Sequence, residues 1–338
     1  YNKKSILLFD RNSLLSVQAI ESIRNFGLIG VYVLEPAEPL PPMTQEDLEF
    51  ERFQIKAVSA IEEELDRILK TRKQSRIQTI ADMVIRNYGH LDEKINFYQN
   101  LRSLEDYVSR HSLNVAILCA MITHVMNIRR EEQYHTVCAA LLHDMGKLKK
   151  HEDVYFGAPY SREDAIRNCE TQEEAYSVIE DAFATEGPAI RRICQQAAGK
   201  QLDLFPEEGK GSRYKMLEGS NVLLVANRYD EITAMTLQGT AQSEVKAAQE
   251  LLEHPEVYDP ETVQALLRSI NILPPGASVE LSTGEKALVL SENEENVLCP
   301  TVVSFRDNSI LNLALPQNED IQIVDVMKTM DNRYILKK

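Results

Sequence analysis

The chain has 338 residues, of which 43% are hydrophobic and 26% charged, and its formal net charge at pH 7 is −15. This length is enough for roughly two to three domains with a sizeable hydrophobic core. The negative charge argues against nucleic acid and anionic membranes as partners, because their phosphates would be repelled. A compact anionic ligand in a locally basic pocket is compatible with it.

The cysteine content and the hydropathy indicate a cytoplasmic protein. The five cysteines are widely spaced and form no Cys-x-x-Cys motif, so we expect reduced thiols. No apolar stretch approaches the roughly 20 residues that a membrane-spanning helix needs, and no signal peptide is evident. Because Tyr1 stands within a strand-like segment, we expect that some native N-terminal residues are absent from the sequence.

Residues 1–43 predict a small α/β unit followed by a linker. The segments 5–9 (SILLF) and 30–35 (GVYVLE) are rich in strand-forming residues, and the stretch between them has helical spacing that ends at Gly27. Four prolines within residues 36–42 predict a stiff linker.

Residues 44–272 predict a helical domain. From Met43 to Met145 the chain has no proline and one glycine, Gly89, which is typical of several long helices. Thr44 followed by Asp47 resembles the start of a helix with a capping box. Prolines then separate further helical segments as far as about Ile270.

Residues 273–338 predict a small antiparallel β unit. After LPPG (273–276) the hydrophobic residues alternate in short runs, and the stretches STGE and SENEEN supply turn residues. The predicted fold is therefore mainly α, with a helical core between a small N-terminal α/β unit and a small C-terminal antiparallel β unit.

Two of the predicted helices carry ionisable residues on apolar stretches. In the first, across residues 101–130, His111 lies on a helix whose expected core residues are Leu104, Val108, Val115, Leu118 and Ile122, so it points along or near the buried face. The second ends in ALLHDMGKLKK (140–150), which places His143 beside Asp144.

The glycine after this pair bears on what the pair can bind. Adjacent helical residues project about 100° apart. His143 and Asp144 therefore reach one point only near a helix end, where Gly146 gives the backbone freedom to bend. Imidazole nitrogen and carboxylate oxygen suit manganese, iron or zinc as ligands.

A histidine on one helix, a His–Asp pair on the next and a later acidic or amide residue is similar to the pattern of the HD superfamily of metal-dependent phosphohydrolases. Four blocks narrow the resemblance to its HD-GYP branch, bacterial hydrolases of the second messenger cyclic di-GMP. These blocks are RHSLNVAIL (110–118), ALLHDMGKL (140–148), LLVANRYDEITA (223–234) and the stretch from Tyr258 to Leu290. The opening segment also resembles the small domain that often precedes these hydrolases.

The resemblance implies an HD fold with a divalent transition metal ion (manganese, iron or zinc) held by His111, His143, Asp144 and Asn227. It implies catalytic roles for Asp144, which would orient water, and for Lys147, which would hold phosphate charge. The residues alone leave other roles open: a core histidine for His111, a hydrogen-bonded structural pair for His143 and Asp144, a helix residue for Asn227, and an ordinary helix C-terminal cation for Lys147.

Several positions depart from the family's pattern. The family has a glutamate one helical turn before its first histidine, and that position here is Tyr107. Where the family has a single histidine, a His–His pair and Gly-Tyr-Pro, residues 152–253 of this chain contain no histidine. The replacements by spacing are Cys169 or a neighbour for the single histidine, Gln195 and Gln196 near the pair, and LFP (204–206) for Gly-Tyr-Pro.

The family's late aspartate is replaced by Asn227, a weaker and uncharged ligand, whereas Asp230 keeps a second acidic position and is expected to cap or brace its helix. These losses fall on the ligands that a second metal ion requires. We therefore expect at most one ion per chain and absent or very slow hydrolysis of cyclic di-GMP. The alternative is an active single-metal HD phosphohydrolase acting on a phosphodiester or nucleotide, so the sequence leaves enzymatic activity open.

The resemblance further implies a role in cyclic-nucleotide signalling. The expected ligand is a cyclic dinucleotide or another nucleotide. By family habit the chain would form a homodimer or bind a signalling protein.

Overall fold

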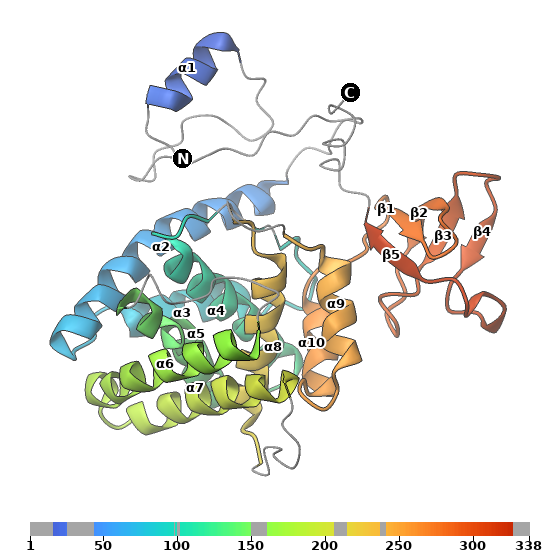
Figure 1. Cartoon of the computed structure of the whole chain (residues 1–338). Coiled ribbons are helices and arrows are strands. Elements are labelled where there is room, and N and C mark those ends of the chain that lie inside the picture. The colour runs from blue at the N-terminus through green and yellow to red at the C-terminus, as the bar shows by residue number, and fades with distance from the viewer. Residues whose placement is uncertain are drawn as a thin grey trace.

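The computed structural model describes residues 16–25, 44–97, 99, 102–149, 161–205, 215–236 and 241–326. Over these residues the chain is mainly helical, and a small antiparallel sheet follows the helices (Figure 1). The α-helices are α1 (Val17–Asn25), α2 (Gln45–Thr71), α3 (Ile77–Tyr88), α4 (Tyr107–Val125), α5 (Arg130–Leu142), α6 (Arg162–Phe183), α7 (Gly187–Gln201), α8 (Glu218–Thr233), α9 (Glu244–Glu253) and α10 (Pro260–Ser269). The short 3₁₀ helices are η1 (Met145–Lys149), η2 (Leu202–Leu204) and η3 (Pro316–Asn318).

The predicted N-terminal unit is only partly covered by these residues. Helix α1 lies within the segment predicted to be helical. The strands predicted at 5–9 and 30–35 and the proline-rich linker lie outside the described residues.

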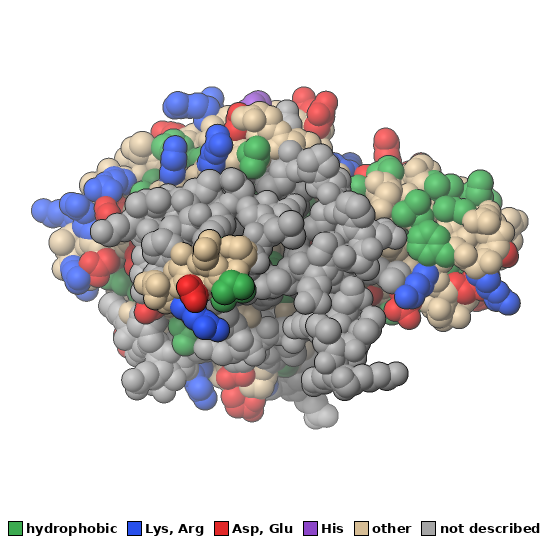
Figure 2. Space-filling view, turned by 90° about the horizontal axis from the view of Figure 1, so that it is seen from above, with side chains coloured by type: hydrophobic (Ala, Val, Ile, Leu, Met, Phe, Trp, Pro, Cys, Tyr) green, Lys and Arg blue, Asp and Glu red, His purple; other side chains and the backbone are tan. Residues whose placement is uncertain are grey.

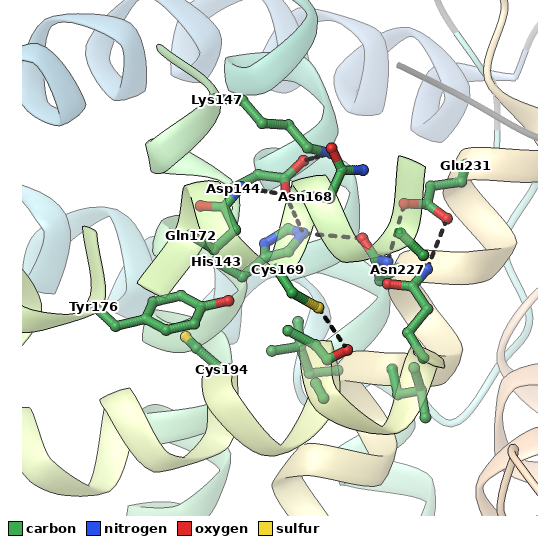
Figure 3. A pocket seen from close by; sticks show the side chains of 16 residues that line it. His143, Asp144, Lys147, Asn168, Cys169, Gln172, Tyr176, Cys194, Asn227 and Glu231 are labelled. Carbon is green, nitrogen blue, oxygen red and sulfur yellow. Dashed lines mark hydrogen bonds and ion pairs between the residues drawn. The ribbon is translucent and has the colours of Figure 1, made fainter. Parts of the chain in front are cut away.

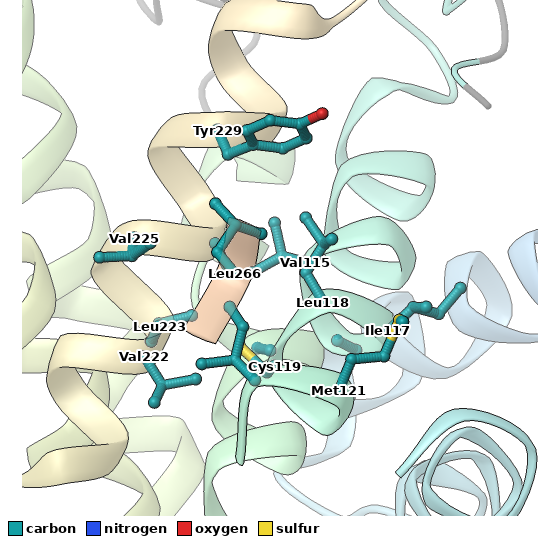
Figure 4. Packing of buried hydrophobic residues seen from close by; sticks show 14 of the residues in the cluster. Val115, Ile117, Leu118, Cys119, Met121, Val222, Leu223, Val225, Tyr229 and Leu266 are labelled. Atoms are coloured by element: carbon teal, nitrogen blue, oxygen red, sulfur yellow. The ribbon is translucent and has the colours of Figure 1, made fainter. Parts of the chain in front are cut away.

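Helix α4 is the centre of the helical core. Hydrophobic residues surround its whole circumference, and nearly every side chain from Tyr107 to Thr123 is buried. A helix that is apolar all round is stable in water only when other helices cover it. Helices α2, α3, α5, α8 and α10 all contact α4, and Figure 4 shows Val115 and Leu118 packed toward α8 and α10. His111 is therefore held inside the protein.

The start of this helix differs from the sequence prediction. The helix begins at Tyr107, and Leu104 lies in the turn before it with 46% of its surface exposed. The apolar spacing that included Leu104 was wrong at that position, whereas Val108, Val115, Leu118 and Ile122 are buried as expected.

The chain after α5 turns as the sequence predicts. His143 is the C-cap of α5, and residues 145–149 continue as η1. At Gly146 a Cβ atom would lie 2.6 Å from Gln172 Oε1 and 2.6 Å from the Thr171 carbonyl oxygen, which is too close for any side chain. Glycine therefore allows η1 to lie directly against α6.

The C-terminal strands form one antiparallel sheet, as predicted. They are β1 (Ser278–Leu281), β2 (Lys286–Ser291), β3 (Thr301–Ser304), β4 (Ile310–Asn312) and β5 (Ile323–Val326), in the order β4-β3-β2-β1-β5. Gly284 has φ +77° in the turn between β1 and β2, a conformation that favours glycine. The predicted fold class, mainly α with a small C-terminal antiparallel sheet, is confirmed over the described residues.

The sheet also presents apolar side chains to solvent. Phe305 is 53% exposed and Ile310 on the edge strand β4 is 67% exposed. Figure 2 shows hydrophobic side chains gathered over this part of the molecule.

No helix among the described residues is both long and apolar enough to cross a membrane.

The last helix ends at Ser269 and the first strand begins at Ser278. The domain limits at residues 43 and 272 stay predictions.

Candidate metal centre

Three acceptor atoms from three different helices converge at one point. His111 comes from α4, His143 from the end of α5, and Asn227 from α8. The two Nε2 atoms lie 3.1 Å apart, and Asn227 Oδ1 lies 2.8 Å from His111 Nε2 and 2.9 Å from His143 Nε2. All three side chains are buried.

The hydrogens of the two imidazoles point away from this point. His111 Nδ1 lies 2.6 Å from Asp230 Oδ2, and His143 Nδ1 lies 2.8 Å from the carbonyl oxygen of Ala140. Both partners accept hydrogen bonds, so Nδ1 of each ring is the donor, and in a neutral ring Nε2 then presents a lone pair. Burial, the largest influence, lowers the pKa of His143, so this ring is neutral near pH 7.

The amide of Asn227 is oriented by a neighbour that sequence reasoning did not identify. Asn227 Nδ2 donates to Glu231 Oε1 at 3.2 Å, one helical turn further along α8. This contact turns Asn227 Oδ1 toward His143, as Figure 3 shows, and toward His111. Glu231 is itself held by Gln201 Nε2 at 3.1 Å and by Arg228 at 3.3 Å.

Asp144 and Lys147 complete the cluster. Asp144 Oδ2 lies 3.5 Å from His111 Nε2 and 2.7 Å from Lys147 Nζ, and Asp144 Oδ1 lies 3.9 Å from His143 Nε2. Burial is the largest single influence and opposes ionisation of Asp144, but Lys147 and the two histidines together outweigh it and hold the pKa of this carboxyl well below its usual range. Asp144 is therefore a carboxylate at physiological pH.

Asp230 braces the site from behind by bonding to residues outside its own helix, whereas the sequence predicted that it caps or braces that helix. It accepts two hydrogen bonds from Arg102, both at 2.7 Å, one from Asn114 at 3.0 Å and one from Gln99 at 2.9 Å, besides the one from His111. Burial is the largest single influence and opposes its ionisation, but Arg102 and His111 together outweigh it and depress the pKa of Asp230 far below its usual range. A carboxylate that fixes the tautomer of a histidine in this way is typical of metal sites.

Tyr107 occupies the position one turn before His111. Its ring stacks on the imidazole of His111, with 5.6 Å between the centroids and 29° between the planes. The Arg102 guanidinium lies 5.3 Å from the centre of the same ring. Tyr107 therefore contributes ring contacts to His111 and Arg102, at the position where the family that the sequence resembles has a glutamate.

The donor set fits a divalent cation. Ligand atoms about 2.0–2.2 Å from one ion, at angles near 90–109°, lie roughly 2.8–3.6 Å from one another, which matches the spacings of His111, His143 and Asn227. With both rings neutral, three acceptors would face one another without a hydrogen between them, and a bound cation would relieve the repulsion between them. Among the described residues, His111, His143 and Asp144 form the one group of three or more His, Cys, Asp or Glu side chains arranged for a metal.

A small cavity opens beside this cluster. His143, Asp144, Lys147 and Asn227 line one side of it, and its volume is about 40 Å³. Typical small-molecule pockets have roughly 300–1,000 Å³, whereas one water molecule needs about 10–15 Å³ of such volume. The described residues therefore leave room for an ion with a few waters.

The rest of the cavity wall corrects part of the assignment that was made by residue spacing. Helix α6 contributes Cys169 but also Gln172, whose Nε2 donates to Asp144 Oδ1 at 3.2 Å. Neither Gln195 nor Gln196 lines the cavity. Gln195 donates to Glu173 at the surface, and Gln196 accepts from the backbone of Leu217. The face of α7 toward the cavity instead carries Cys194, Ala197, Ala198 and Gln201.

The segment predicted in place of Gly-Tyr-Pro lies elsewhere. Leu204 and Phe205 line a second cavity with residues of α8 and α9. Pro206 lies outside the described residues.

Comparisons with known proteins agree with this geometry. Residues 108–235 match the family model of the HD domain, and this range contains His111, His143, Asp144 and Asn227. Cyclic di-GMP phosphodiesterase PA4108 of Pseudomonas aeruginosa PAO1 is 22% identical over 215 residues, which cover 61% of this chain and 49% of that protein. The chain thus spans about half the length of this curated relative.

Among solved structures, Bd1817, an HDG"Y"P protein from Bdellovibrio bacteriovorus, matches with a TM-score of 0.46 and 17% sequence identity. The match covers 67% of this chain and 73% of that chain. The family model shows that residues 108–235 carry an HD domain, and the similarity to the curated relative supports a phosphohydrolase fold of the HD-GYP type.

Proposed function

We propose that this chain is a divergent HD-GYP-like protein of bacterial cyclic-nucleotide signalling that binds one divalent transition metal ion and hydrolyses cyclic di-GMP very slowly or not at all. The ion is manganese, iron or zinc, and its ligands are His111, His143, Asp144 and Asn227. The free cysteines of the described chain support a cytoplasmic setting.

One observation supports this proposal: ligand atoms for one cation lie together, whereas the described residues of the wall around them offer no second set. Besides the cluster, the described cavity wall offers thiols, amides, the Tyr176 hydroxyl and aliphatic side chains, and its remaining carboxylate, Glu231, is already bonded to Asn227, Gln201 and Arg228. The thiols are poor candidates, because burial raises the pKa of Cys169 to about 11 and keeps it protonated.

A bound divalent ion would supply a Lewis acid that lowers the pKa of a coordinated water and neutralises phosphoryl charge. The chain's own residues then have separate tasks. His111 and His143 would hold the ion through their Nε2 atoms, and Asp144 presents a charged oxygen that would orient water. Lys147 lies against Asp144 and supplies positive charge for a phosphate oxygen.

The cavity size also supports slow turnover of a large substrate. A cyclic dinucleotide would bring two bases, two sugars and two phosphates to the site, whereas the described residues enclose about 40 Å³. We therefore propose that a cyclic dinucleotide or nucleotide binds with one phosphate near Lys147 while most of the ligand stays outside this cavity.

Metal content is the test of this proposal. Protein purified without chelators and incubated with manganese or iron is expected to retain one ion per chain after desalting, measured by elemental analysis. The His143→Ala variant should retain none, because it loses one of the two imidazole ligands. Two or more stoichiometric ions in the wild type would show that other residues replace the missing ligands and would refute the single-metal assignment.

A further inference from the structure

Gln172 on α6 contacts the His–Asp segment with both ends of its side-chain amide. Its Nε2 donates to Asp144 Oδ1 at 3.2 Å, and its Oε1 accepts from the backbone N–H of Gly146 at 2.9 Å. The side chain is 3% exposed. Gln172 therefore bonds to a cluster carboxylate and to the backbone two residues after it.

The backbone geometry makes this contact close. Any side chain at position 146 would collide with Gln172 Oε1, because a Cβ there would lie 2.6 Å from it. A glycine at 146 and a glutamine at 172 therefore form one matched contact between η1 and α6. Figure 3 shows Gln172 beside Asp144 on the side away from Asn227.

The contact divides the two oxygens of Asp144 between different partners. Oδ1 accepts from Gln172, while Oδ2 faces Lys147 at 2.7 Å and His111 Nε2 at 3.5 Å. Without Gln172 the carboxylate would lose the neutral donor on its Oδ1 side, and rotation toward Lys147 would be less restricted. The hydrogen bond thus fixes which oxygen faces His111 and Lys147.

We propose that Gln172 is a positioning residue for Asp144, which sets the orientation of this carboxylate toward the metal ion. The inference rests on the proposed metal site and adds a residue that lies on α6, outside the four ligands. Hydrogen-bond partners of metal ligands typically change metal affinity by about 10–100-fold when they are removed.

The test compares metal binding by the wild type and by Gln172→Met, which keeps the length and volume of the side chain but removes both hydrogen bonds. Titration with Mn²⁺ is expected to give one site in both proteins, with affinity about 10–100-fold lower in the variant. The visible absorption spectrum of the Co²⁺-loaded protein is expected to shift as well, because the oxygen donor changes its position.

Gln133→Met is the matched control. Gln133 is also buried, and its Nε2 bonds to oxygen atoms of Gly89, Ala120 and Thr123 away from the cluster. This control should lose stability without a change in metal affinity or in the Co²⁺ spectrum.

Unchanged affinity and spectrum in Gln172→Met, with the wild type binding one ion, would overturn the positioning role and leave the metal site standing. Equal changes in Gln133→Met would also overturn it, because the effect would then come from lost stability alone. A wild type that binds no metal would refute the proposed function and, with it, this inference.

Discussion

Replacing Asp230 by alanine is expected to lower the free energy of unfolding by about 3–5 kcal/mol, because it leaves a buried guanidinium without its counter-charge. The side chains of Arg102 and Asp230 are both fully buried and joined by two hydrogen bonds of 2.7 Å. Asn114, Gln99 and His111 would lose their shared acceptor at the same time. Urea unfolding followed by circular dichroism measures the loss.

Two further variants separate the charge from the rest of the network. Asp66→Ala removes an exposed carboxylate paired with Lys70, and it should change stability by less than about 1 kcal/mol. The double variant Arg102→Met with Asp230→Asn removes both buried charges and should recover part of the lost stability. A loss below about 1 kcal/mol in Asp230→Ala would mean that this buried pair does not support the fold.

Replacing Asn227 by aspartate is expected to tighten metal binding by about tenfold or more, because a charged oxygen then takes the place of the amide oxygen. The same change should lower the thermal stability of the metal-free protein. The new carboxylate would face the carboxylate of Glu231, which in the wild type accepts a hydrogen bond from Asn227 Nδ2. Calorimetric titration with Mn²⁺ and thermal unfolding with and without the ion measure both effects.

Asn221→Asp is the control for added charge on the same helix. Asn221 lies on α8 before Asn227 and is outside the cavity wall. Combining Asn227→Asp with Glu231→Gln should restore a hydrogen bond between the two positions and recover stability without metal. If Asn227→Asp bound Mn²⁺ no tighter than Asn221→Asp, Asn227 would not be a ligand.

Part of the metal cluster could be predicted from the sequence. His143 and Asp144 stand at a helix end beside Gly146, so local spacing indicates that these two residues share a site. His111 sits within an apolar helix and was joined to them through the family resemblance. The structure places Asn227 and Lys147 beside them. The helical core and the C-terminal sheet also follow from local patterns, namely proline spacing and alternation between turn residues.

The surroundings of the cluster could not be predicted in the same way, because they depend on how distant helices are rotated against each other. Gln172 and Arg102 look like ordinary polar residues in the sequence, and their partners lie 28 and 128 positions away. Gln195 and Gln196 were placed near the site by residue counting, yet α7 turns Ala197 and Ala198 toward the cavity. An error of two residues along a helix rotates a side chain by about 200°, which moves it to another face.

Turnover of cyclic di-GMP tests the central claim most directly. The steady-state rate is measured with manganese or iron supplied, for the wild type and for His143→Ala, beside calorimetric binding of the same nucleotide. A missing metal ion removes several kcal/mol of transition-state stabilisation, and each 1.36 kcal/mol lost slows the reaction about tenfold. We therefore expect a rate roughly three or more decades below that of a multi-metal enzyme. Binding without turnover is the predicted result. A rate of about one per second that disappears in His143→Ala would contradict the account and show that this chain is an active phosphodiesterase.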